Sequence, residues 1–262
     1  MDKKARILGG ILMASQPIYE FYVELKEYEP KIWRRFQVAR NITMARLGYI
    51  IMTMFEMQAS HLFCIDVLEK QNMRNRFVNS FSEEEIEKML SEYERKEVRR
   101  YEVQNELTED FDNEENENAE TAKMYSMISK TGDEMLFSYD YGDGWQVRIV
   151  LESVFEDKEL SGKQLPRVIE GEGYGIVENC GGVGGLENLS KILRDKGHTR
   201  YKELCEWFDI EELDLTVFDI EDMNFRLKKV PRIYKDSYEL GYYPTQRSLD
   251  LLTRKYKKAP RS

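Results

Sequence analysis

The chain has 262 residues, 41% of them hydrophobic, and its 39 basic and 49 acidic side chains give a formal net charge of −10. This composition supports a substantial core and excludes a wholly disordered chain. The net charge argues against a protein whose entire surface neutralises phosphate. The three cysteines cannot all pair with one another, so we expect a cytoplasmic protein.

The first half of the chain contains strand patterns on both sides of a helix pattern. After an N-terminal arm over residues 1–17, alternating apolar residues predict a hairpin over 18–28 and 32–38. A helix over 44–57 follows, capped by Asn41 or Thr43. Residues 61–67 and 74–78 are the next predicted strands. This order favours an antiparallel sheet that the helix covers.

A helix start and a highly acidic segment come next. Ser82 followed by Glu83, Glu84 and Glu85 is typical of a capped helix N-terminus. Residues 106–120 contain eight acids and no Lys or Arg, which predicts a solvated, mobile insertion. A second interpretation is an acidic decoy for a nucleic-acid groove.

The second half begins with the clearest hairpin pattern, residues 134–141 and 145–151 around a Gly-Asp-Gly turn. A glycine-rich loop (171–185) and short helices over 186–194 and 200–208 complete a predicted domain over residues 18–208. Residues 209–262 form a helical or irregular C-terminal extension, with a final helix over 246–254 and a basic end. The fold class predicted from these patterns is α+β, with a mainly antiparallel sheet and helices packed on it.

Four separated motifs resemble one family, the plasmid pRiA4b ORF-3-like proteins, also described as insertion-element passenger proteins. In chain order they are Pro30-Lys31-Ile32-Trp33-Arg34-Arg35-Phe36, Ser60-His61-Leu62-Phe63, Tyr139-Asp140-Tyr141-Gly142-Asp143-Gly144-Trp145, and Leu165-Pro166 leading to Gly171-Glu172-Gly173 and Glu178-Asn179-Cys180-Gly181-Gly182. The resemblance covers residues 18 to about 200. It implies an α+β fold and carriage on mobile genetic elements.

The chain departs from the family pattern at three places. Family members carry a histidine soon after the Asp-x-Trp turn, where this chain has Gln146 or Val147. They carry a cysteine and two prolines in the glycine-rich loop, where this chain has residues 175–177. They also carry a tryptophan before the second motif, where this chain has Met57 or Gln58. Chemistry that depends on those side chains is not expected here.

The residue types favour one metal site above others. His61, Cys64, Cys180 and Cys205 form a Cys₃His set, which suits tetrahedral Zn²⁺. Residues three apart on a strand point to opposite faces, so His61 and Cys64 converge only across a bulge or a strand end. The alternative is that the cysteines are small buried side chains and His61 is hydrogen-bonded in the core.

Two other kinds of site remain open. Five acids near the central hairpin and the glycine-rich loop can bind Mg²⁺ or transfer protons, although roles in turns and strand caps are the alternative: Asp140, Asp143, Glu170, Glu172 and Glu178. Trp33, Arg34 and Arg35, with the basic tail, allow a nucleic-acid interpretation, and a surface strand with a buried Trp edge explains the three strand residues equally well.

The function predicted from the sequence is that of a non-enzymatic interaction protein of a mobile genetic element. Its partner is expected to be a protein, such as a host defence nuclease, and its role that of a zinc-stabilised acidic inhibitor comparable to an anti-CRISPR protein. One alternative is a metal- or carboxylate-dependent enzyme that acts on nucleic acid or a small molecule. Another is a DNA-binding accessory protein that uses Arg34, Arg35 and the basic tail.

Overall fold

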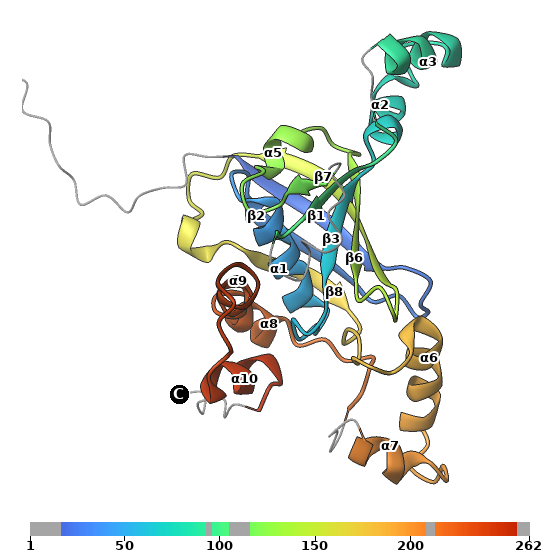
Figure 1. The fold of residues 1–262 in the computed structure, drawn as a ribbon, viewed down its shortest axis with the longest axis vertical. Helices are drawn as coiled ribbons and strands as arrows, with labels where there is room; N and C mark the ends of the chain where they lie inside the picture. Colours follow the sequence, from blue (N-terminus) through green and yellow to red (C-terminus); the bar gives the residue numbers. More distant parts are fainter. Residues whose placement is uncertain (1–16, 93–95, 105–115, 208–212, 256–262) are drawn as a thin grey trace, which may run out of the picture.

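The computed structural model describes residues 17–92, 96–104, 116–207 and 213–255 (Figure 1). Its centre is one eight-stranded sheet in the order β5-β4-β3-β6-β7-β1-β2-β8. All neighbouring strands pair antiparallel except β4 and β5. The predicted α+β class is therefore confirmed. No described helix is both long and apolar enough to span a bilayer.

One side of the sheet is built on the predicted N-terminal hairpin. β1 (Ile18–Leu25) pairs with β2 (Trp33–Ala39), and the inward residues of β1 are fully buried, as the alternating pattern predicts. β8 (Arg167–Glu172) forms the edge beside β2. The short helical turn η1 (Gly162–Gln164) precedes it.

The central hairpin has the predicted turn chemistry. β6 (Glu134–Tyr139) pairs with β7 (Trp145–Phe155), and Tyr139 lies opposite Trp145. Asp140 (φ 53°) and Gly144 (φ 69°) take the left-handed conformation that a tight turn requires. β7 also pairs with β1, so the central hairpin joins the two halves of the sheet.

We expect Trp145→Phe to lower the free energy of unfolding by only about 1 to 2 kcal/mol, less than the roughly 3 to 5 kcal/mol of a Trp-to-Ala change. Trp145 is completely buried, but its indole Nε1 has no hydrogen-bond partner in the described residues. Phenylalanine leaves a small cavity and removes that unsatisfied donor. Urea unfolding measures the difference, and a Phe variant as unstable as Trp145→Ala contradicts this explanation.

The other half of the sheet contains β3 (Phe63–Val67), β4 (Arg99–Glu102) and β5 (Glu117–Asn118). β3 is buried along its whole length between β6 and β4. Of the predicted acidic insertion, residues 116–120 are described, and they include β5; the rest lies outside the described residues, as does most of the predicted N-terminal arm. The one-turn helix α5 (Met124–Met127) follows β5.

The C-terminal helices share the core of the sheet domain. α1 (Met44–Met54), capped by Thr43 as predicted, is almost entirely buried and packs against α8 (Ile220–Leu227) and α9 (Val230–Leu240). α10 (Gln246–Leu252) packs on α9, close to its predicted position. The apolar side chains of these helices belong to the same cluster as those of the sheet: Met223, Leu227, Val230, Tyr234, Tyr238 and Leu252. Residues 213–255, predicted from the sequence as part of a C-terminal extension, are therefore part of the main fold.

Two helical pairs project from opposite ends of the sheet (Figure 1). One is α2 (Glu69–Phe77) with α3 (Glu83–Glu92), which we call the α2–α3 arm; the other is α6 (Gly182–Leu193) with α7 (Tyr201–Trp207). The predicted strand over 74–78 is wrong, because this segment lies in α2. Its anchor is Asn72, whose side chain exchanges two hydrogen bonds with the backbone of Glu134 at 2.7 and 3.0 Å.

Candidate functional site

Three of the four motifs meet at His61. Its Nε2 lies 3.4 Å from Asp140 Oδ2 and 3.8 Å from Glu178 Oε2. His61 precedes β3, Asp140 follows β6, and Glu178 lies in the loop before α6, so the sheet places residues up to 117 positions apart in one cluster. His61 is also packed edge-on against the ring of Tyr139.

Glu178 binds the three segments to one another. Its carboxylate accepts hydrogen bonds from the Tyr139 hydroxyl at 2.6 Å, from the Ser60 hydroxyl and from the Gln58 backbone N–H. The Glu178 side chain is only 6% exposed. Burial and the nearby Glu178 charge raise the pKa of Tyr139 well above its usual value, which keeps the phenol a donor. Glu178 is therefore a hydrogen-bonded anchor for its loop.

Asp140 and Asp143 stabilise the turn beneath that loop. Asp140 Oδ1 accepts from the backbone N–H groups of Gly142 and Asp143, at 3.0 and 3.3 Å. Asp143 Oδ2 accepts from the N–H of Gly181. Gly182 has a φ of +68°, and a Cβ there would lie 2.5 Å from the Asp143 carbonyl oxygen. The two glycines thus allow the loop to rest directly on the hairpin turn.

The arrangement contains one partly exposed imidazole. The His61 side chain is 31% exposed, and when protonated it forms ion pairs with both neighbouring carboxylates. The carboxylates themselves are occupied by hydrogen bonds that hold loops together. Of the five acids grouped from the sequence, Asp140, Asp143 and Glu178 come together. The remaining two do not, because β8 directs Glu170 to Arg35 and Glu172 to Trp33.

We expect Glu178→Gln to lower the free energy of unfolding by about 1 to 3 kcal/mol, because an amide places donors against the buried donors that Glu178 satisfies. His61→Gln, at the exposed rim of the same cluster, should change it by less than about 1 kcal/mol. Thermal or urea unfolding of both variants makes the comparison. A larger effect at His61 than at Glu178 contradicts the anchoring role.

The buried Arg34 is a second structural centre. Its guanidinium donates to four backbone carbonyls, those of Trp33, Glu172, Gly173 and Tyr174. It also lies 3.8 Å from the centre of the Phe218 ring. Arg34 is 0% exposed, and burial lowers its pKa to about 9. It holds the start of the glycine-rich loop against β2.

The neighbouring Arg35 faces the other side of β2, as strand alternation predicts. It pairs with Glu152 at 2.5 Å and also with Glu170. Trp33, on the same face, is half-buried. A DNA contact by Arg34 has no support in this arrangement, because its side chain is buried beneath the loop.

The four predicted zinc ligands lie on different parts of the fold. Cys64 is buried within β3; Cys180 is half-buried, with its Sγ 3.6 Å from the Gly182 carbonyl oxygen; Cys205 lies on α7. His61 instead faces Asp140 and Glu178. In the part of the chain that the structure describes, no three or more His, Cys, Asp or Glu side chains form a group suited to a metal ion. Zinc binding by these residues stays a prediction.

The thiols give that prediction a test. Burial raises the pKa of Cys64 to about 11 and that of Cys180 to about 12. At pH 8 about one in a thousand Cys64 thiols, or fewer, is ionised, so both cysteines should react with a maleimide at least about 100-fold more slowly than in urea. Site-resolved mass spectrometry measures these rates. Fast native labelling contradicts this expectation. Labelling that speeds up only with a chelator, together with release of zinc, favours the zinc site, because zinc-bound thiolates are also protected.

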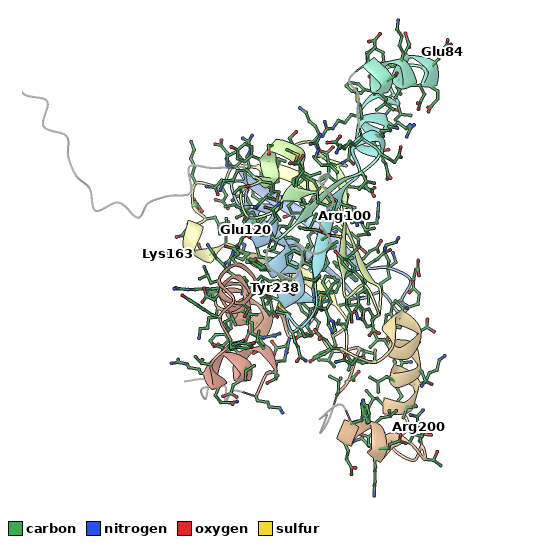
Figure 2. All side chains as sticks on the ribbon, in the orientation of Figure 1. Glu84, Arg100, Glu120, Lys163, Arg200 and Tyr238 are labelled. Carbon is green, nitrogen blue, oxygen red and sulfur yellow. The ribbon has the colours of Figure 1, made fainter. Side chains whose placement is uncertain are left out.

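The exposed acidic residues of the α2–α3 arm lie on α3. α3 exposes Glu83, Glu84, Glu85, Glu87 and Glu92, with Lys88 as its only basic residue. Its apolar residues Ile86 and Leu90 are buried. Figure 2 shows Glu84 at the far end of the arm, away from the sheet. Ser82 forms the predicted cap with Glu85, which stabilises the helix start.

Comparison with known proteins agrees with the motifs. The model of the plasmid pRiA4b ORF-3-like protein family matches residues 17–226, which is most of the chain. The chain belongs to this family. The match ends within α8, whereas the resemblance carried by the motifs ends at about residue 200. The inclusion of α8 in the match agrees with the packing of this helix against β8.

The chain is similar to a curated protein and, in fold, to a solved structure. The uncharacterized protein y4hQ of Sinorhizobium fredii (strain NBRC 101917 / NGR234) is 28% identical over 107 residues, which are 40% of this chain. The matched part spans about half of that relative, 54%. The crystal structure of protein of unknown function MM3350 from Methanosarcina mazei Go1 has a TM-score of 0.59 and 23% identity. The structural similarity covers 79% of this chain and 97% of the chain of MM3350. This likeness shows the fold.

Proposed function

We propose that this chain is a non-enzymatic binding protein of a mobile genetic element, and that the α2–α3 arm is its binding surface. The observation that carries the proposal is the row of exposed glutamates on a helix that projects from the sheet. A projecting anionic surface complements a groove whose own charge is positive. The partner class that fits is a protein that normally handles nucleic acid.

Residues 69–92 carry six acidic and four basic side chains, a net charge of −2, and five of the six acids lie on α3. Arg74 of α2 pairs with Glu87 at 2.5 Å and lies 3.8 Å from Glu83. Lys88 lies 3.8 Å from Glu92. These pairs are exposed and so contribute little energy, and Glu84 extends at the tip. If the partner is a host defence nuclease, occupation of its groove would make the chain an inhibitor, as an anti-CRISPR protein is.

The site geometry gives the other candidate functions less support. Asp140, Asp143 and Glu178 are used in hydrogen bonds that hold the turn and loop, which favours a structural role over acid-base catalysis. Arg34 is buried and Arg35 is paired with two glutamates, which disfavours a DNA contact through β2. The binding role is the one that the exposed charge favours.

The test is affinity capture from a host lysate with the full chain, Glu84→Lys and Glu156→Lys as bait. Glu156 is an exposed acid after β7, so its reversal is a matched control for net charge. We expect mass spectrometry to identify a nucleic-acid-handling protein whose recovery falls at least about fivefold with Glu84→Lys and stays unchanged with Glu156→Lys. Recovery should also fall between 50 and 300 mM salt. Equal capture by both variants contradicts the proposal.

A further inference from the structure

Exposed basic side chains follow α9 and the turn before it. Residues 227–249 carry five basic and two acidic side chains, a net charge of +3 in a chain whose net charge is −10. Four of the basic side chains are exposed and close in sequence: Lys228, Lys229, Arg232 and Lys235. Of these four, only Lys235 forms an ion pair within the described residues, with Glu239 at 3.4 Å. The positive charge of this surface is therefore available to an anionic partner.

The packing of α9 explains why these cations face outward. Val230, Tyr234 and Tyr238 recur every four residues, are buried, and turn one face of the helix towards α1. The two tyrosine hydroxyls donate to backbone carbonyls of the segment that follows α1. This fixes the rotation of α9 about its axis. Arg232 and Lys235 are thereby held on the exposed side of the helix.

Exposed aromatic rings lie at both ends of this row of cations. α9 ends at Gly241, and the next two side chains, Tyr242 and Tyr243, are 66% and 96% exposed. At the other end, Phe225 is 41% exposed, and Lys229 Nζ lies 3.9 Å from the centre of its ring. The 11 residues of α9 span about 16 Å. Cations along a helix with free aromatic rings beside them can hold phosphates and stack bases at the same time.

This combination distinguishes between classes of anionic partner. An acidic peptide pairs with the cations but makes no use of the exposed rings. A nucleic-acid duplex offers phosphates but keeps its bases stacked inside. An unpaired strand offers both phosphates and base faces. The acids of α9 reduce the positive charge only in part, because Glu239 is held by Lys235 and by the Tyr49 hydroxyl at 3.2 Å.

We propose that α9 and the turn after it bind single-stranded nucleic acid. Its phosphates lie on the exposed cations of α9 and of the turn before it, and its unstacked bases lie on Tyr242 and Tyr243. The proposal is independent of the proposed function, because Figure 1 shows α9 and α10 at the lower left and α3 at the upper right of the molecule. It is also separate from a contact through β2, because it uses no residue of that strand.

Fluorescence anisotropy with the full chain and a labelled oligo(dT) of about 15 nucleotides tests the proposal. The expected Kd is on the order of 10 μM at about 50 mM salt. The logarithm of the affinity should fall with the logarithm of the salt concentration with a slope of about −2 to −3, because each phosphate contact on a single strand contributes about −0.7. A duplex and a poly-glutamate peptide of similar length should each bind at least about threefold more weakly. No binding at about 200 μM, or equal binding of the duplex or the peptide, overturns the proposal.

Four variants place the strand on this surface. Arg232→Glu should weaken binding at least about fivefold, whereas Lys202→Glu, an exposed charge reversal in the first turn of α7, should leave it unchanged. Tyr243→Ala should weaken binding at least about fivefold, whereas Tyr243→Phe keeps the ring and should bind like the unchanged chain. Circular dichroism checks the fold of each variant.

The tyrosine pair decides if Arg232→Glu does not fold, since the Tyr243 side chain is almost wholly exposed. Full affinity in Tyr243→Ala, or equal effects of Arg232→Glu and Lys202→Glu, overturns the proposal.

Discussion

Glu56→Gln should lower the free energy of unfolding by about 3 to 5 kcal/mol, the largest loss that we expect from a single charge removal here. Both oxygens of Glu56 lie 2.6 to 2.7 Å from Arg226 NH1, and Arg254 contacts the same carboxylate at 2.6 and 3.1 Å. The Arg226 side chain is 0% exposed and that of Glu56 is 4% exposed. Without Glu56, Arg226 is a buried cation without its counter-ion.

This ion network also explains how the C-terminal helices are held. Arg226 belongs to α8, Arg254 follows α10, and Glu56 follows α1. Arg254 NH1 pairs in addition with Asp222 of α8 at 3.0 Å. One carboxylate at the end of α1 thus fixes residues nearly 200 positions later. We expect the amides of α10 to lose protection from hydrogen exchange in Glu56→Gln before those of the sheet.

Urea unfolding with tryptophan fluorescence measures the effect. The control is Glu87→Gln, which removes an exposed partner of Arg74 and should change the free energy of unfolding by less than about 1 kcal/mol. A double variant, Glu56→Gln with Arg226→Met, should recover part of the loss because it also removes the unpaired charge. Equal effects at Glu56 and Glu87 would falsify the buried-network account.

Arg34→Met should have the second largest effect, a loss of about 3 to 4 kcal/mol. Four backbone carbonyls lose their donor at once, and the contact with Phe218 is lost. Methionine fills much of the space of the arginine side chain. The loss in free energy of unfolding is therefore due more to the missing hydrogen bonds than to a cavity. We expect the loop at residues 171–176 to be the first part of the structure that is destabilised.

The matched control is the next residue in the strand. Arg35→Met removes half-exposed pairs with Glu152 and Glu170, and we expect a loss below about 1 kcal/mol. Hydrogen exchange adds local detail: the Tyr174 and Ile176 amides, which donate to Leu215 and Phe55, should exchange faster in Arg34→Met. If Arg35→Met is as destabilising as Arg34→Met, Arg34 does not have the anchoring role assigned to it.

Sequence periodicity predicts the sheet well, because its signal is local. The alternation over residues 18–25 and the Gly-Asp-Gly turn before Trp145 each predict a hairpin that the structure contains. The prediction of a strand over residues 74–78 is wrong for the opposite reason, because the contact that decides the structure there is not local. Its helix is stabilised by Asn72 bonding to Glu134, 62 residues away, which no short window contains. Tertiary contacts of this kind override weak local preference.

The C-terminal helices and the site show a different limit of sequence reasoning. α8 contains buried Asp222 and Arg226, which interrupt the apolar stripe that would reveal a core helix. The sequence patterns group Asp140 with Glu178 and assign His61 to the three cysteines, so they miss the contact of His61 with these two carboxylates. Which groups each side chain contacts depends on the register of β3 and β6, and that register directs His61 to carboxylates and not to cysteines.

The proposed binding role depends on competition between the α3 glutamates and nucleic acid for one groove. The most direct measurement is the affinity of the captured partner for the full chain with and without saturating duplex DNA. We predict that DNA weakens binding of the chain at least about tenfold, and that Glu84→Lys binds weakly whether or not DNA is present. Simultaneous binding of DNA and the chain to the partner, at undiminished affinity, contradicts the account.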